Sequence, residues 1–131
     1  MSTEDTIRQA IDAYDRGDAD TVAALLHADV CYTINSNADL GPYHADCHSK
    51  AEFFNAVSAI QADWSIDSYK LGDLIVSGNR GAAQIQIQMT SHHSGRTTQT
   101  RLALFMTVEG GKLTEIHEYH DTANVGTARQ M

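Results

Sequence analysis

Residues 73–92, with the sequence DLIVSGNRGAAQIQIQMTSH, predict a β-hairpin and set the fold class. From Gln84 to Met89 a glutamine alternates with an apolar residue, which is typical of a strand with one polar and one apolar face. Ahead of it, Ser77-Gly78-Asn79 provides the residue types that tight hairpin turns prefer. We therefore expect strands over residues 67–76 and 82–92, joined by this turn.

The same two-residue period continues toward the C-terminus. Ser94-Gly95 and Gly110-Gly111 are turn signals, and the segments after them, 97–108 and 113–121, are rich in strand-forming residues. Successive strands joined by short turns pair as an antiparallel meander. From residue 122 onward we expect a frayed tail.

The first half of the chain is predicted to be mainly helical. Apolar residues spaced by three and four predict a helix that ends at Gly17, and Asp18 or Asp20 starts a second, short helix. A strand is expected over 30–34, followed by a loop over 35–48. A capping-box pattern then opens a third helix at Ser49, which presents four large apolar residues: Phe53, Phe54, Val57 and Ile60. Helices followed by a meander predict an α+β domain.

Length and charge narrow the function classes. The 131 residues fit one domain, and nine Lys and Arg against seventeen Asp and Glu give a net charge of −8. Because nucleic acids and anionic lipids attract basic surfaces, we expect no nucleic-acid partner and no membrane association. No targeting segment is visible, so a cytoplasmic location is expected. Cys31 and Cys47 are too few for a disulfide framework and are predicted to be small buried residues.

Four segments, in this order, carry a resemblance to a known superfamily: residues 11–18 (IDAYDRGD), 26–30 (LHADV), 73–80 (DLIVSGNR) and 111–121 (GKLTEIHEYHD). Through them, residues 5–123 resemble the nuclear transport factor 2-like superfamily, and most of all its SnoaL-like polyketide cyclases and ketosteroid-isomerase-like proteins. The resemblance implies a single SnoaL-like domain over residues 1–131. Its fold is a cone, in which a curved antiparallel sheet wraps around N-terminal helices and leaves an internal apolar pocket. The superfamily holds enzymes and binding proteins, so the fold does not fix the function.

The resemblance does not extend to the steroid isomerase site. Ketosteroid isomerases use a Tyr of the first helix, a carboxylate base after the first strand and an Asp in the strand before the last. Counted from Gly17 and Gly111, these positions fall on residues that cannot fill the roles: Ala10, Ile34 or Asn35, and Ala103. Tyr14 lies on the wrong helical turn for this role. Steroid isomerisation by that route is not expected.

SnoaL-like cyclisation implies a simpler site, with an Asp as general base and polar neighbours for the enolate oxygen. Asp121 matches the family base, and strand periodicity places His117 on the same face. Arg101, on the adjacent strand, is expected to converge with them at the mouth of the cone. Arg101 and Asp121 also match part of the Arg-x-Asp and Asp relay of limonene-epoxide-hydrolase-like proteins, in which Ala103 replaces the middle Asp. The alternative is that Asp121 only ends its strand, paired with Arg101 or Arg80.

The resulting hypothesis is a small-molecule pocket protein. It is either a SnoaL-like enzyme for base-assisted cyclisation, isomerisation or dehydration of an apolar carbonyl compound, or a non-catalytic ligand-binding or dimerisation module. A roomy cavity with converging polar groups favours a ligand site, and a solid core favours the module. Besides the catalytic candidates Asp121, His117 and Arg101, the residues expected to bind the small apolar ligand are Asn35, Phe53, Tyr32, Trp64, Phe105 and Tyr119.

Two further expectations concern partners. Only one face of the strand 84–89 can line a cone, so the other face is expected to be solvated or to form a homodimer. No cofactor and no metal site are expected, because the histidines at 92, 93, 117 and 120 do not share faces in pairs. The segment from His44 to His48 could reach a metal, but no second ligand cluster with zinc-like spacing accompanies it.

Overall fold

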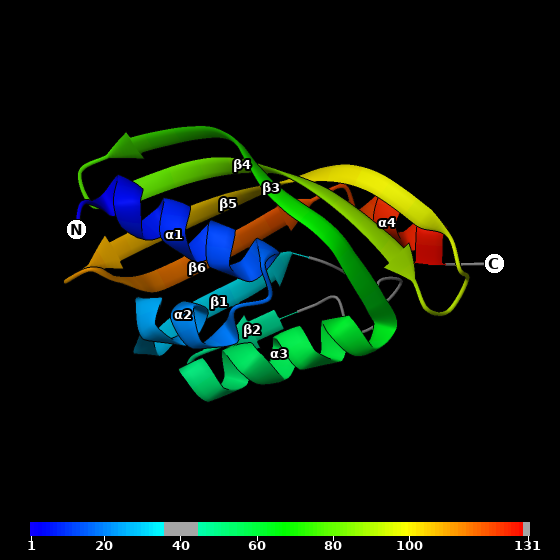
Figure 1. Cartoon of the computed structure of the whole chain (residues 1–131), viewed down its shortest axis with the longest axis horizontal. Coiled ribbons are helices and arrows are strands. Elements are labelled where there is room, and N and C mark those ends of the chain that lie inside the picture. The colour runs from blue at the N-terminus through cyan, green and yellow to red at the C-terminus, as the bar shows by residue number, and fades with distance from the viewer. Residues whose placement is uncertain (36–44, 130–131) are drawn as a thin grey trace.

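A curved sheet wrapped around the N-terminal helices forms the protein, as Figure 1 shows for the computed structural model, which describes residues 1–35 and 45–129. The elements in chain order are α1 (Thr3–Asp15), α2 (Ala19–Leu25), β1 (Leu26–Asn35), β2 (Ala45–Cys47), α3 (Lys50–Asp63), β3 (Trp64–Ser77), β4 (Arg80–Ser91), β5 (Thr97–Glu109), β6 (Lys112–His120) and α4 (Thr122–Arg129). The predicted α+β cone is confirmed. No helix in the described ranges is long and apolar enough to cross a membrane.

The six strands form one open sheet in the order β2-β1-β6-β5-β4-β3. Strands β3 to β6 are the predicted antiparallel meander. Strand β1, however, pairs with β6 in parallel, so the expectation of a wholly antiparallel sheet is wrong at this pair. The physical reason is connectivity: most of the chain separates β1 from β6, and such a long connection permits a parallel pair. Strand β2 lies within the predicted loop, whose residues 36–44 are outside the described part.

Helix α1 lies on the concave side of the sheet, against β3 to β6. Ser2 caps it by accepting a hydrogen bond from the Asp5 amide, at 3.1 Å. Its apolar face enters the core as predicted, with Ile7 fully buried. The helix approaches β4 closely, since a Cβ on Gly81 would lie 2.5 Å from Cδ1 of Ile7. This close contact fixes the helix inside the cone.

Helix α3 begins where the sequence predicts. Its N-cap is Ser49, whose Oγ accepts a hydrogen bond from the Glu52 amide at 3.1 Å. The Glu52 side chain accepts from the amide of His48, at 2.8 Å, and so satisfies a neighbouring donor. Phe53, Val57 and Ile60 are buried, and the helix packs against β1, β2 and β3.

The expectation of a frayed tail is wrong, because residues 122–129 form helix α4. Asp121 caps this helix by accepting a hydrogen bond from the Asn124 amide, at 3.0 Å. Val125 is fully buried, and Arg129 Nε lies 2.7 Å from Asp63 Oδ2. Burial of Val125 and the ion pair with α3 anchor the segment, whose own sequence pattern is too short to reveal a helix.

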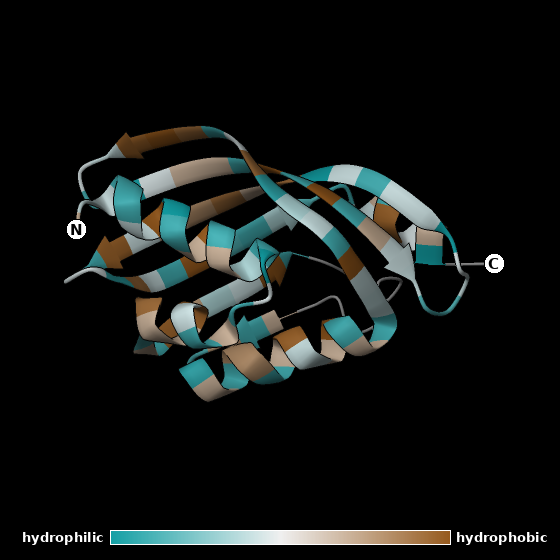
Figure 2. Cartoon of the chain, in the orientation of Figure 1, coloured by the Kyte–Doolittle hydropathy of each residue, from teal (hydrophilic) through white to brown (hydrophobic). Residues whose placement is uncertain are grey.

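The alternation of side chains divides the sheet into an inner and an outer face. Along β4, Ala83, Ile85, Ile87 and Met89 are buried, whereas the glutamines between them are exposed or half-buried. Figure 2 shows this alternation as hydrophobic and hydrophilic bands along the strands. The hydrophobic core therefore lies between the inner face and the helices.

Candidate functional site

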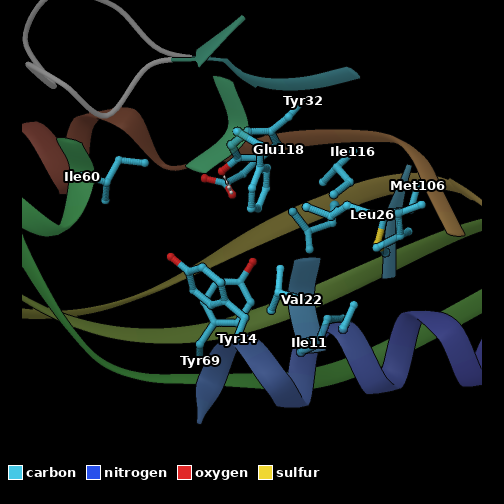
Figure 3. A pocket seen from close by; sticks show the side chains of 14 residues that line it. Ile11, Tyr14, Val22, Leu26, Tyr32, Ile60, Tyr69, Met106, Ile116 and Glu118 are labelled. Carbon is cyan, nitrogen blue, oxygen red and sulfur yellow. Dashed lines mark hydrogen bonds between the residues drawn. The ribbon is translucent and has the colours of Figure 1, made fainter. Parts of the chain in front are cut away.

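An internal pocket of about 60 Å³ lies between helices α1 to α3 and the inner face of the sheet. Most of its wall is aliphatic, with Ile11, Leu104 and Ile116 among the residues that line it. Figure 3 shows the pocket with its side chains pointing inward from helices and strands that are far apart in the sequence. A cavity of this size holds one functional group or a few water molecules.

One end of the pocket is polar and holds a carboxylate and three phenols. Glu118 comes from β6 and is only 3% exposed. Tyr32, from β1, donates its hydroxyl to Glu118 Oε1 at 3.3 Å. Tyr14 and Tyr69 come from α1 and β3, and their ring centroids are 4.6 Å apart. Their hydroxyls lie on the side of the rings that faces Glu118 (Figure 3). Four elements thus bring these groups together.

Tyr14 and Tyr69 remain neutral at physiological pH. Burial raises the pKa of Tyr14 and the pKa of Tyr69, and the negative charge of Glu118 raises both further. A neutral phenol keeps its proton and can donate it in a hydrogen bond. The polar end therefore offers hydrogen-bond donors beside a carboxylate.

His120 lies next to Glu118 on the inner face of β6. Its Nε2 is 3.8 Å from Glu118 Oε2, and its side chain is only 1% exposed. Burial lowers the pKa of His120 to about 4, partly opposed by the charge of Asp121. The imidazole is therefore neutral at pH 7, and its approach to Glu118 is a contact between a carboxyl group and a neutral ring.

The three predicted catalytic residues do not converge in this pocket. Asp121 is exposed and caps α4. Arg101 is exposed on the outer face of β5, opposite Gln86 of β4. His117 is half-buried on the outer side, where its Nδ1 lies 2.7 Å from Thr33 Oγ1. None of the three lines the pocket.

The predicted ligand-binding residues divide into two groups. Tyr32 and Phe53 line the pocket, and Trp64 is fully buried in the core without lining it. Phe105 and Tyr119 are 45% and 47% exposed on the outer face, where their rings form an edge-to-face pair at 5.9 Å. The sixth predicted residue, Asn35, belongs to neither group and is exposed at the end of β1.

A β-bulge in β6 explains the misplacement of its residues. Glu115 pairs with Thr107 of β5, but the next pair joins Leu113 to Val108, so Thr114 is an extra residue. One extra residue moves every later side chain to the opposite face. Glu118 therefore points inward, whereas strict alternation along β6 predicts that His117 points inward.

Some of these residues could have been identified from the sequence. The apolar residues Leu113 and Ile116 are three apart, which breaks the two-residue period and signals the bulge. Tyr14 continues the apolar face of the first helix, and it lines the pocket although family spacing puts it on the wrong turn. Tyr69 has no such signal, because a tyrosine in a strand is common.

The described residues hold no group of three or more His, Cys, Asp or Glu side chains placed to bind a metal ion. In the segment from His44 to His48, His48 Nε2 lies 3.2 Å from Asp46 Oδ1, and both side chains are largely exposed. His44 is outside the described residues.

Comparisons with known proteins agree with this architecture. No curated protein sequence matches the chain. An NTF2-like protein of unknown function from Burkholderia pseudomallei is 21% identical, with 100% of both chains covered and a TM-score of 0.88. A "putative polyketide cyclase" from Pseudomonas putida is 19% identical, with 98% of both chains covered and a TM-score of 0.79. A "putative isomerase" from Rhodopseudomonas palustris is 19% identical over 90% of this chain and 87% of that one, with a TM-score of 0.75.

The comparison with family models decides the assignment. The model of the SnoaL-like domain matches residues 7–116, which include most of α1, the whole of α2 to β5 and the first half of β6. Three of the four residues at the polar end of the pocket lie within this range, and Glu118 follows it by two positions. The chain belongs to the SnoaL-like domain family.

Proposed function

We propose that the protein is an enzyme that removes a proton next to the carbonyl group of a small apolar compound, with Glu118 as the general base. The observation that carries this proposal is a buried carboxylate that faces two neutral phenols in an otherwise apolar pocket. Carboxylates that accept a carbon-bound proton need such an arrangement, because the negative charge then moves to the carbonyl oxygen.

The chemistry follows from the positions of the groups. Glu118 takes the proton, and the electrons of the C–H bond move into the carbonyl to form an enolate. Tyr14 and Tyr69 donate hydrogen bonds to the enolate oxygen and so stabilise it, most effectively where water is excluded. The proton on Glu118 then returns to a different carbon, which completes an isomerisation, or to a departing hydroxyl, which completes a dehydration. In a cyclisation the enolate carbon instead attacks a second carbonyl, whose oxygen takes the proton.

This proposal keeps the reaction class expected from the sequence but changes the base from Asp121 to Glu118. The SnoaL-like family assignment supports the reaction class, and the names of two structural neighbours, a cyclase and an isomerase, are compatible with it. The small volume of the cavity favours the alternative, a binding or dimerisation module with a nearly filled interior. The two candidates differ in whether Glu118 moves a proton.

Deuterium exchange at the α-carbons of 2-butanone and cyclohexanone, followed by NMR in D₂O, tests the base directly. Wild-type protein is expected to accelerate exchange above the buffer rate, and Glu118→Gln is expected to lose about 10²-fold or more of that acceleration. Tyr14→Phe removes one oxyanion donor and is expected to cost about 10²–10³-fold. Asp121→Asn is the matched control, since Asn also caps helices and Asp121 lies outside the pocket. If wild type and Glu118→Gln exchange at the same rate, the enzyme proposal fails and the module remains.

We also infer that the protein forms a homodimer through the outer face of the sheet. Phe105 and Tyr119 expose an edge-to-face aromatic pair there, and Ile75 is 71% exposed on β3. Such surfaces are typical of protein interfaces. Sedimentation at tens of micromolar is expected to give a dimer, and Phe105→Ser is expected to shift it toward monomer. The free thiols of Cys31 and Cys47 are compatible with the cytoplasmic location that we propose.

A further inference from the structure

A second hollow, of about 200 Å³, opens on the surface next to the internal pocket. One wall is the turn between α1 and α2, from Gly17 to Ala19. The opposite wall is a single face of α3, which presents Phe54, Val57 and Ser58. We call this hollow the α3 cleft. Helix α3 packs mainly on β1, β2 and β3, so space remains between it and the α1–α2 turn.

Only one layer of side chains separates the α3 cleft from the internal pocket. Tyr14, Val22 and Phe53 line both hollows. Tyr14 is half-buried, and its hydroxyl faces Glu118 while another part of the residue reaches the cleft. The Phe53 ring stands 4.8 Å from the ring of Tyr32 on the pocket side, measured between centroids. A rotation of Phe53 would therefore join the two spaces.

The rim of the α3 cleft is polar, and among the described residues that line it the only charged side chain is acidic. Ser58 and Gln61 are exposed on α3, and Asp18 lies opposite them. Hydrogen bonds from Thr21, and then the nearby charge of Arg16, lower the pKa of Asp18, so it is ionised at neutral pH. Arg16 pairs with Asp18, at 3.4 Å, and with Asp12, at 2.9 Å, so one guanidinium faces two carboxylates and the net charge of the three side chains is negative. Such a rim offers hydrogen bonds but repels anions.

We propose that the substrate reaches Glu118 through the α3 cleft and is an uncharged amphipathic molecule, whose carbonyl-bearing apolar part passes Phe53 and whose polar end stays at Ser58 and Gln61. This inference rests on the proposed function for the position of the chemistry. The internal pocket alone is too small for most metabolites, whereas the pocket and cleft together accommodate a molecule of one or two rings. Carboxylates and phosphorylated carriers at the outer end are disfavoured by Asp18.

Two fluorescent probes test the route and the charge separately. 2-Naphthol mimics an enol in shape and carries no charge at pH 7, and 6-hydroxynaphthalene-2-sulfonate adds an anion at the far end of the same rings. We expect stopped-flow mixing with 2-naphthol to give an association rate constant at least tenfold lower for Ser58→Trp than for wild type. Ala59→Trp is the matched control, because successive helical residues point about 100° apart and position 59 lies opposite the cleft face.

The charge experiment uses the ratio of the two dissociation constants. Wild type is expected to bind the sulfonate at least tenfold more weakly than 2-naphthol. Asp18→Asn is expected to reduce this ratio severalfold without unfolding α2, because Asn caps helices as well as Asp does. Equal affinities of wild type for the two probes would overturn the inference about the uncharged end.

The outcomes separate this inference from the proposed function. Equal association rates for Ser58→Trp and Ala59→Trp, or no binding of 2-naphthol by wild type, overturn the α3 cleft as the route. If ketone exchange depends on Glu118 in that case, the catalytic proposal still holds. If 2-naphthol binds at a rate that depends on position 58 and no exchange occurs, the cleft is supported and the catalytic proposal fails.

Discussion

Replacing Phe53 with alanine perturbs the wall between the pocket and the α3 cleft, and its cost can be worked out from the structure. Phe53 is 5% exposed and packs against Tyr32 and Phe54, at centroid distances of 4.8 and 5.2 Å. Buried Phe→Ala changes cost about 3–5 kcal/mol, and each aromatic pair contributes about 0.5–1.5 kcal/mol of such a loss. Because the ring already borders two hollows, it makes fewer contacts than a fully surrounded side chain. We therefore expect the low end, about 3 kcal/mol.

Urea unfolding measured by tryptophan fluorescence is a suitable assay. Trp64 is the only tryptophan and is fully buried, so its emission shifts when the core opens. Phe53→Ala is expected to lower the midpoint without changing the slope, and to lower Tm by roughly 10 °C. Phe54→Ala is the matched control: Phe54 is half-buried, and about 1–2 kcal/mol is expected. A loss below 1 kcal/mol for Phe53→Ala, or one smaller than that of Phe54→Ala, would refute the packing argument.

Three other predictions concern stability. Ser49→Ala removes the cap of α3 and is expected to lower the free energy of unfolding by about 1 kcal/mol in urea titrations. Val125→Ala is expected to cost about 2 kcal/mol, whereas a frayed tail would give no change. The pKa of His120 is about 4 when folded and near 6.5 when unfolded, so the unfolded chain binds more protons between these pH values. The free energy of unfolding is therefore expected to fall by about 2 kcal/mol from pH 7 to pH 5 because of His120. The variant His120→Gln is expected to lack this decrease.

Elements with a strong local pattern could be predicted from the sequence. The four meander strands begin and end within a few residues of their predicted bounds, and α3 begins directly after its predicted cap, Ser49. In each case one residue type marks the boundary, such as Ser49 as a cap or Gly78 in a turn with positive φ. The periodicity between the boundaries then fixes which side faces the core.

Elements stabilised by distant contacts could not be predicted in this way. Helix α4 has only eight residues, and its burial of Val125 and its ion pair with Asp63 become visible only in three dimensions. The parallel pairing of β1 with β6 could not be predicted for the same reason, because the sequence of neither strand identifies the strand with which it pairs.

The residues at the polar end of the pocket could not be predicted for a related reason. Tyr14, Tyr69 and Glu118 come from three elements, and their proximity depends on how α1 lies in the cone. Counting from family landmarks placed the expected tyrosine on Ala10, whereas the helix carries its tyrosine at Tyr14, and both positions line the pocket. Sequence spacing therefore led to the family, but not to the residues that form the polar end of the pocket.

The bulge at Thr114 determines both faces of β6 at once. Beyond it, Glu118 points into the pocket and Tyr119 points outward to Phe105. Without the extra residue, the carboxylate would be exposed and the tyrosine would fill the pocket, because a shift of one position exchanges the two faces of a strand. The buried Glu118 carboxylate and the exposed aromatic pair are therefore coupled through the backbone. A chain that keeps this bulge keeps both the buried carboxylate and the exposed aromatic pair. The bulge therefore connects the proposed catalytic site to the proposed dimer surface.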